Sequence, residues 1–333
     1  MTHKTARPTL PPGGLAPKQI VSTQLTKKKK KMMKTRTCLM APAMAALLLG
    51  ACSNDEATDS VDLSRPIALS FAPSAPEVTT RATIGTEGAT FQADDQVGLY
   101  VDGTDYANVC YTCGGNTWDA SEVLYWPDAG THTFRAYYPY METVSNAITL
   151  PADQSTAEAF TKADLMWVKQ EQKATNSPIT LPLGHRMSLI KLDISQGEGI
   201  TLDEIKEMIP AIHGSIPTVG TWDLTTGEVT FAANAAAMES IRPYMDGSDG
   251  TALTYYALVM PNTSFAEKAR FFSLADGETT YSYYLNIAGG FTAGQAQYCD
   301  FDLTVNRTGI SITGFSVSNW TESTTGSGTV SMD

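Results

Sequence analysis

Apolar and polar residues alternate with a period of two over much of this chain from Ile67 onward. Ile67, Leu69 and Phe71 show the alternation first, and it recurs at residues 97–101 and 190–194. Such alternation places one side of an extended strand in a core and the other side in solvent. Similar strand-like segments cover residues 133–138, 255–260, 270–274, 281–285 and 298–305. The pattern predicts a protein built mainly of half-buried β-strands.

Turn-forming residues separate these segments at short intervals. The triplet Gly-Gly-Asn at 114–116 and the pair Thr-Gly at 226–227 are typical of hairpin turns. Short strands with frequent turns favour antiparallel β-sandwiches over alternating α/β units. The alternation slips by one residue at Gly314, where a β-bulge would keep both halves of the strand on the same core.

One short helix interrupts the strand pattern near residue 200. Thr201 can cap its first turn, and Glu204 has the spacing that completes a capping box. Its apolar face comprises Leu202, Ile205 and Met208. We expect this helix to be a small addition to a sheet protein.

The stretch 34–52 has the layout of an export signal. Lys34 and Arg36 form a short positive start, an apolar run covers residues 39–49, and two small residues precede Cys52. The apolar run is shorter than the roughly 20 residues that a membrane-spanning helix requires. We therefore predict export without a permanent transmembrane helix.

The order Leu-Gly-Ala-Cys at 49–52 resembles the lipobox of bacterial lipoproteins. The resemblance implies cleavage between Ala51 and Cys52, diacylglycerol on the Cys52 sulfur, and acylation of the new amino group by a fatty acid such as palmitate. Two or more acyl chains anchor a protein stably, whereas one binds only marginally. The alternative is an ordinary secretory signal with an incidental cysteine.

The segments on either side of this signal are polar. Residues 1–32, rich in Pro, Lys and Thr, show no apolar periodicity, and we interpret them as a non-native extension, with the true start at Met32 or Met33. Residues 33–51 would then be the signal peptide. Residues 52–62 form an acidic tether that resembles the signal by which Bacteroidetes lipoproteins reach the outer face of the outer membrane.

Removal of residues 1–51 makes the chain strongly acidic. That segment holds 10 of the 23 Lys and Arg residues and none of the 35 Asp and Glu residues, which leaves a net charge of about −22. Such a charge disfavours DNA, RNA and anionic lipid as partners. The remaining 282 residues suffice for one large or two medium domains with real cores.

Motifs that carry catalytic chemistry are absent from the sequence. It holds no nucleophile elbow, no metalloprotease helix motif, no P-loop and no dinucleotide glycine fingerprint. His132, His185 and His213 stand far apart, and we interpret each as a surface or core residue. We predict no enzyme and no cofactor.

The cysteines and one acidic loop are the remaining candidates for metal or redox chemistry. Cys110 and Cys113 are three apart on a predicted strand, so their side chains point to opposite faces. We interpret them and Cys299 as packing thiols, with a disulfide in a turn as the alternative. Two carboxylates near 246–249 could hold calcium, but such a pair is usually only a loop, so no metal is predicted.

Short aromatic blocks follow one another in a fixed order along the chain. They are FQADDQVGLY at 91–100, NTW at 116–118, LYWP at 124–127, FRAYYPY at 134–140, DLM at 164–166, HRMS at 185–188, LTVNRTG at 303–309 and Trp320. In this order, over about residues 62–325, the chain resembles the Bacteroidetes fimbrillin family (Mfa-like proteins). The resemblance implies two tandem transthyretin-like (immunoglobulin-like) β-sandwich domains. Members of the family serve as shaft, anchor or tip subunits of surface fimbriae (pili).

The resemblance predicts the domain plan and the function. We expect an N-terminal sandwich at 63–182, a C-terminal sandwich at 183–333, and a structural and adhesive role at the cell surface. Expected partners are other fimbrial subunits, the outer membrane through the lipid, and a host or bacterial surface glycan or protein, but no nucleic acid. The alternative is a non-polymerising outer-membrane lipoprotein that binds glycan or another ligand, with outward aromatic rings as stacking platforms.

The connector after the first predicted strand is open to proteolysis. Pro73, Pro76 and the polar run 79–83 disfavour a β-ladder there. In fimbrillins an arginine-specific protease cuts a matching linker, which here implies a cut between Arg81 and Ala82. Arg65 is a weaker candidate because Pro66 follows it.

The cut would release the first strand together with its lipid. Its residues Ile67, Leu69 and Phe71 would leave an apolar groove with unpaired backbone groups, which a strand from a neighbouring subunit could fill. The alternative is that Arg81 is a solvated loop residue and the protein stays whole as a lipidated anchor or ligand-binding protein.

Overall fold

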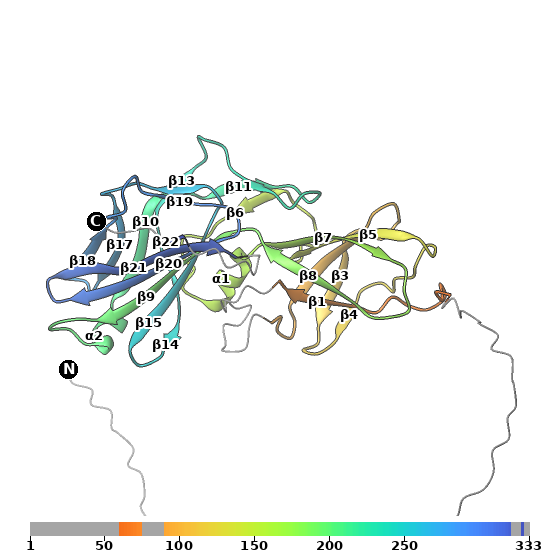
Figure 1. The fold of residues 1–333 in the computed structure, drawn as a ribbon, viewed down its shortest axis with the longest axis horizontal. Helices are drawn as coiled ribbons and strands as arrows, with labels where there is room; N and C mark the ends of the chain where they lie inside the picture. The colour runs from red at the N-terminus through yellow and green to blue at the C-terminus, as the bar shows by residue number, and fades with distance from the viewer. Residues whose placement is uncertain (1–59, 75–89, 321–327, 330–333) are drawn as a thin grey trace, which may run out of the picture. The chain divides into compact units, whose positions relative to one another are not determined.

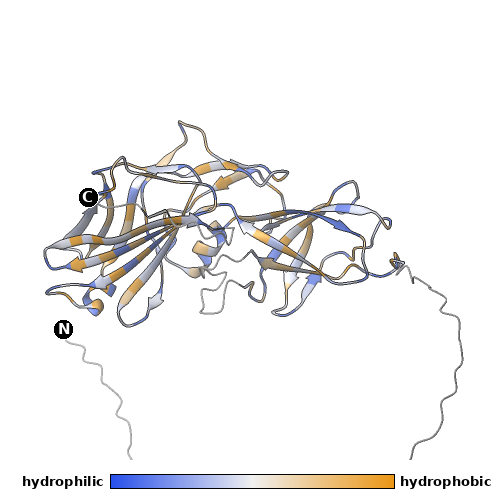
Figure 2. Cartoon of the chain, viewed as in Figure 1, coloured by the Kyte–Doolittle hydropathy of each residue, from blue (hydrophilic) through white to orange (hydrophobic). Residues whose placement is uncertain are grey.

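The structure is a computed structural model that describes residues 60–74, 90–320 and 328–329. All of these residues belong to one compact unit, Ala57–Asp333. Strands account for most of the described segments (Figure 1), and orange and blue positions alternate along them (Figure 2). The predicted all-β fold is confirmed.

The first half of the chain forms a seven-stranded sheet. Its order is β1 (Leu69–Pro73), β8 (Ile179–His185), β7 (Met166–Lys173), β5 (Thr131–Tyr138), β2 (Gln96–Val101), β3 (Val109–Cys113) and β4 (Trp118–Ala120). Neighbouring strands are antiparallel except β1 and β8, which are parallel. The two end strands of this order also lie close to each other.

The second half builds its sandwich from two larger sheets. One contains β14 (Tyr244–Ser248), β15 (Ala252–Val259), β9 (Ser188–Gln196), β20 (Gln297–Asn306), β21 (Gly309–Asn319) and β22 (Gly328–Thr329). The other contains β13 (Ala237–Ile241), β10 (Ile209–Pro217), β17 (Arg270–Ala275) and β18 (Thr280–Tyr284). Smaller sheets pair β12 (Val229–Thr230), β11 (Val219–Trp222) and β6 (Ala147–Thr149), and β16 (Thr263–Phe265) with β19 (Phe291–Ala293).

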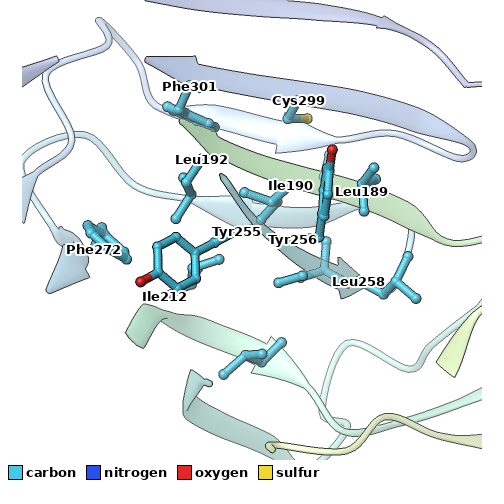
Figure 3. Packing of buried hydrophobic residues seen from close by; sticks show 14 of the residues in the cluster. Leu189, Ile190, Leu192, Ile212, Tyr255, Tyr256, Leu258, Phe272, Cys299 and Phe301 are labelled. Carbon is cyan, nitrogen blue, oxygen red and sulfur yellow. The ribbon is translucent and has the colours of Figure 1, made fainter. Parts of the chain in front are cut away.

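Two clusters of buried apolar side chains form the cores. The first includes Val97, Phe134 and Leu181. The second is built around Leu192, Tyr255, Phe272 and Phe301, which come from strands of both larger sheets (Figure 3), and it includes Cys299. Side chains from before residue 183 also join the second cluster, namely Tyr137, Leu150, Phe160, Ala163, Leu165 and Trp167. The domain boundary near Leu183 stays a prediction.

The local turn predictions are confirmed. The Gly114 amide donates to the Thr117 carbonyl (2.8 Å) in the hairpin that joins β3 to β4. The Gly227 amide donates to the Asp223 carbonyl (2.6 Å) in the turn between β11 and β12. The β20–β21 register shifts next to Gly314, because Asp302 pairs with Gly314 and Leu303 pairs with Ile312, so one residue bulges.

Two short helices accompany the sheets of the described residues. Helix α2 (Leu202–Lys206) has the predicted capping box, in which Thr201 accepts from the Glu204 amide and Glu204 accepts from the Thr201 amide. Helix α1 (Ala157–Ala163) was not predicted; Thr156 caps it, and Phe160 stacks on Tyr244 with ring centroids 5.5 Å apart. No helix among the described residues is long and apolar enough to cross a membrane.

Gly98, in the first aromatic block, occupies a position where a side chain would not fit. Gly98 pairs with Tyr137 on β5, and a Cβ at this position would collide with the Tyr137 ring. The tyrosine hydroxyl donates to the Asn108 side chain at 2.7 Å. A glycine here therefore lets a large ring lie directly against the strand.

Candidate functional site

Strand β1 occupies one end of the seven-stranded sheet. Its register with β8 runs from Leu69 opposite Ile179 to Pro73 opposite Leu183. The Ile179 amide donates to the Ala68 carbonyl at 2.9 Å. Within the described part of the chain, β8 is its one ladder partner, so removal of β1 would break a single ladder.

The buried face of β1 is apolar and aromatic. Leu69 and Phe71 are 9% and 6% exposed. The Phe71 ring meets Tyr111 and Trp118 edge-on, with centroids 5.1 and 4.8 Å apart. Phe91 extends the contact, with its centroid 5.3 Å from that of Trp118. Burial of two such side chains contributes about 3–6 kcal/mol, which the rest of the sheet would lose if β1 left.

The outer face of β1 carries a polar pair. The Ser70 and Thr180 hydroxyl oxygens lie 2.8 Å apart, and the Ser70 hydroxyl also donates to the Ile179 carbonyl at 3.3 Å. Any strand that replaced β1 would need the same order, with apolar residues facing the core and small polar residues facing outward.

Ile67 lies just before β1 and is half-buried against the first core. Its amide donates to the Leu124 carbonyl at 2.8 Å, and Pro66 forms an isolated bridge with Tyr125. The three residues of the predicted alternation therefore pair with two different segments. Ile67 pairs with residues 124–125, whereas Leu69 and Phe71 pair with β8.

The predicted processing residues fall outside the described residues. This holds for Ala51 and Cys52 at the signal and for Arg81 and Ala82 in the connector. The described chain stops at Ser74, one residue after β1, and resumes at Thr90. The lipidation and cleavage predictions therefore stay predictions.

The three histidines do not form a common site. His132 Nε2 lies 3.1 Å from Asp128, and His213 Nε2 lies 2.8 Å from the Ser273 hydroxyl. Buried His185 places Nδ1 2.8 Å from Asp164 and stacks on Trp320 with ring centroids 3.8 Å apart. Each histidine has its own structural neighbours.

The cysteines pack as thiols. Within the described residues Cys110, Cys113 and Cys299 are free, and Cys113 and Cys299 are buried. Burial raises the pKa of Cys299 to about 12 and also raises the pKa of Cys110. Because the thiolate is the reactive form, these shifts make both sulfurs weak nucleophiles and weak metal ligands at neutral pH.

The loop considered for calcium is a turn between β14 and β15. The Asp249 carboxylate accepts from the Thr251 amide and hydroxyl, both at 2.7 Å, and from the Ala252 amide at 2.9 Å. These bonds lower the pKa of Asp249 to about 2. The carboxylate therefore stabilises its own turn.

A cavity of about 420 Å³ lies beside the first aromatic block. Its lining includes Gln92, Asp94, Asp95, Tyr138, Tyr140 and Lys162. The Tyr138 hydroxyl donates to Asp95 at 2.8 Å, and the Gln92 amide donates to the other Asp95 oxygen at 2.7 Å. Asp94 has a positive φ of 74°, an uncommon conformation outside glycine. The cavity thus combines tyrosine rings with carboxylate and amide groups.

The fold and β1 together define a class of protein: an all-β sandwich protein in which the first strand of the described residues lies at the end of a sheet. The model of the fimbrillin-like family matches residues 80–320, and the chain belongs to this family. This confirms the resemblance found in the aromatic blocks.

Similar proteins named as fimbrium or cell-adhesion proteins agree with the assignment to this family. The chain is 27% identical over 306 residues to a candidate fimbrium subunit, Fim1C, from Bacteroides uniformis, covering 86% of this chain and 95% of that protein. A crystal structure of a candidate cell-adhesion protein from Bacteroides ovatus matches with a TM-score of 0.59 at 17% identity, covering 77% of this chain and 98% of that one. Another from Bacteroides uniformis matches with a TM-score of 0.56 at 23% identity, covering 77% and 99%. The two structures show the shared fold.

Proposed function

We propose that this chain is a surface-anchored structural and adhesive subunit of fimbriae that assembles by donor-strand exchange. The observation that carries the proposal is the position of β1: it ends a sheet, pairs with β8 and covers the first core with Leu69 and Phe71. The family match and the name of the Bacteroides uniformis relative agree with this role.

The proposed assembly begins at the membrane. Cys52 carries the lipid, residues 52–62 act as a tether, and the folded part stands on the outer surface of the outer membrane. An arginine-specific protease then cuts between Arg81 and Ala82. Because the cut follows β1 in the sequence, β1 and the lipid leave together.

The groove that β1 leaves behind is the binding site for the next subunit. Loss of β1 uncovers Tyr111, Trp118 and Leu181 of the first core and leaves the β8 edge without a partner. An exposed apolar groove beside an unpaired edge is a template for a strand from another chain. A neighbouring subunit supplies that strand and joins the two copies without a covalent bond.

A second function is supported by the cavity beside the first aromatic block. A non-polymerising lipoprotein could bind a glycan there, because Asp94 and Gln92 offer hydrogen bonds to sugar hydroxyls and Tyr140 offers a ring face. Asp94→Ala and Tyr140→Ala would then abolish glycan binding. If the protein is a fimbrial subunit instead, the same variants would leave its polymerisation unchanged.

Treatment of the lipid-free chain with an arginine-specific protease tests the main proposal. The expected product begins at Ala82 and forms multimers that resist SDS, whereas Arg81→Ala gives neither. Arg65→Ala is the matched control and behaves as wild type. An Arg81→Ala protein that assembles normally contradicts the mechanism, and glycan binding without multimers supports the second function.

A further inference from the structure

Three aspartates gather on one face of the six-stranded sheet. Asp193 belongs to β9, and Asp300 and Asp302 belong to the parallel neighbour β20, where Asp302 lies opposite Asp193 and Asp300 lies opposite Lys191. One carboxylate oxygen from each aspartate lies within 4.8 Å of the others. The alternation of β20 puts this cluster on the face opposite buried Phe301.

Lys191 neutralises only part of this charge. Its ammonium lies 2.5 Å from Asp193 Oδ2 and 3.5 Å from Asp300 Oδ2. The Thr254 hydroxyl donates to Asp193 Oδ1 at 2.7 Å. Three carboxylates against one ammonium leave an excess of negative charge in a small volume, and like charges at this separation repel each other.

Two buried oxygens at the cluster have no hydrogen-bond partner among the described residues. They are the hydroxyl of Tyr298, a residue that is 3% exposed, and Oδ1 of Asp300. Tyr298 precedes Asp300 by two residues and therefore shares its face of β20. Buried polar atoms without partners are rare, and a bound ion or water is one explanation for them.

We propose that Asp193, Asp300 and Asp302 bind a hard divalent cation of the calcium type, with the Tyr298 hydroxyl beside it. The donors are all oxygens, and three carboxylates on two strands suit the irregular coordination of Ca²⁺ better than the strict octahedron of Mg²⁺. The cation joins β9 to β20, two inner strands of the sheet, and strengthens the second sandwich. This inference does not depend on the proposed assembly mechanism.

Terbium luminescence in the full chain tests the site. Tb³⁺ is a hard cation that replaces Ca²⁺, and a tyrosine nearby transfers excitation energy to it, so Tyr298 reports binding directly. Titration of the wild type should give a saturable signal that Ca²⁺ displaces. Asp302→Asn should weaken binding about tenfold or more, because it removes one ligand charge from an exposed position.

Asp249→Asn is the matched control, because Asp249 is an exposed aspartate in a turn outside the cluster. It should bind Tb³⁺ as the wild type does. Thermal unfolding gives a second readout: Ca²⁺ should raise the Tm of the wild type and of Asp249→Asn but not that of Asp302→Asn. A wild type without a saturable signal, or Asp302→Asn with unchanged affinity, overturns the proposal.

Discussion

The Phe71 ring meets the Trp118 ring edge-on, with centroids 4.8 Å apart and an interplanar angle of 73°. Phe71 lies on β1 and Trp118 on β4, the two ends of the seven-stranded sheet. The contact joins the first and last strands of that sheet across the core. Phe71 thus packs β1 against β4. We propose that β1 is the strand that leaves during assembly.

Phe71→Ala should destabilise the uncleaved protein. The substitution leaves a cavity beside Tyr111 and Trp118, and Phe-to-Ala changes in cores cost about 3–5 kcal/mol. Urea unfolding of residues 60–333, followed by tryptophan fluorescence, measures the loss.

Ser70→Ala is the control for this substitution, because Ser70 lies on the same strand but faces outward. The free energy of unfolding of the Ser70→Ala variant should differ from that of the wild type by about 1 kcal/mol or less, because one partly exposed hydrogen bond contributes about that much. Equal losses for the two variants would show that β1 does not use its aromatic face as we describe.

Strand positions could be predicted because burial depends on local alternation. Leu192, Ile194 and Cys299 lie on the apolar side of their strands, as the sequence indicated, and they are fully buried. The capping box at Thr201 and the bulge at Gly314 were also predictable, because both depend on residues close in sequence. In these features the preference of the local sequence agrees with the final fold, as is usual for natural sequences.

Non-local features could not be predicted in the same way. Nothing in the alternation indicates that β1 pairs with β8 in parallel, about 110 residues along the chain. Helix α1 was missed because only Phe160 and Ala163 face the core, too few for a periodic apolar stripe. The aspartate cluster depends on the parallel pairing of β9 with β20, which places Asp302 beside Asp193.

Glu204 should make stability depend on acidic pH. Hydrogen bonds from Arg307 first, and then from the amide and hydroxyl of Thr201, lower its pKa to about 2. A lowered folded-state pKa gives stability that is present above the ordinary value near 4.5 and is lost as the pH falls toward 2.

Glu204→Gln can test this pH dependence, because glutamine keeps the capping-box geometry but does not titrate. The difference in urea midpoint between wild type and variant should be constant above about pH 5 and should shrink as the pH falls toward 2. A difference that stays constant from pH 7 to pH 2 would show that the hydrogen bonds of Glu204 with Arg307 and Thr201 do not lower its pKa in solution.

A reversible lock between β1 and β8 tests the central claim most directly. Ser70 and Thr180 are opposite each other in the ladder, and their hydroxyl oxygens lie 2.8 Å apart, so Ser70→Cys with Thr180→Cys should form a disulfide. We predict that this variant is cut by an arginine-specific protease but stays monomeric until a reductant is added. It should then form SDS-resistant multimers, as the wild type and the Ser70→Cys single variant do without reductant. Multimers from the oxidised double variant, with the disulfide shown intact by mass spectrometry, would contradict assembly through release of β1.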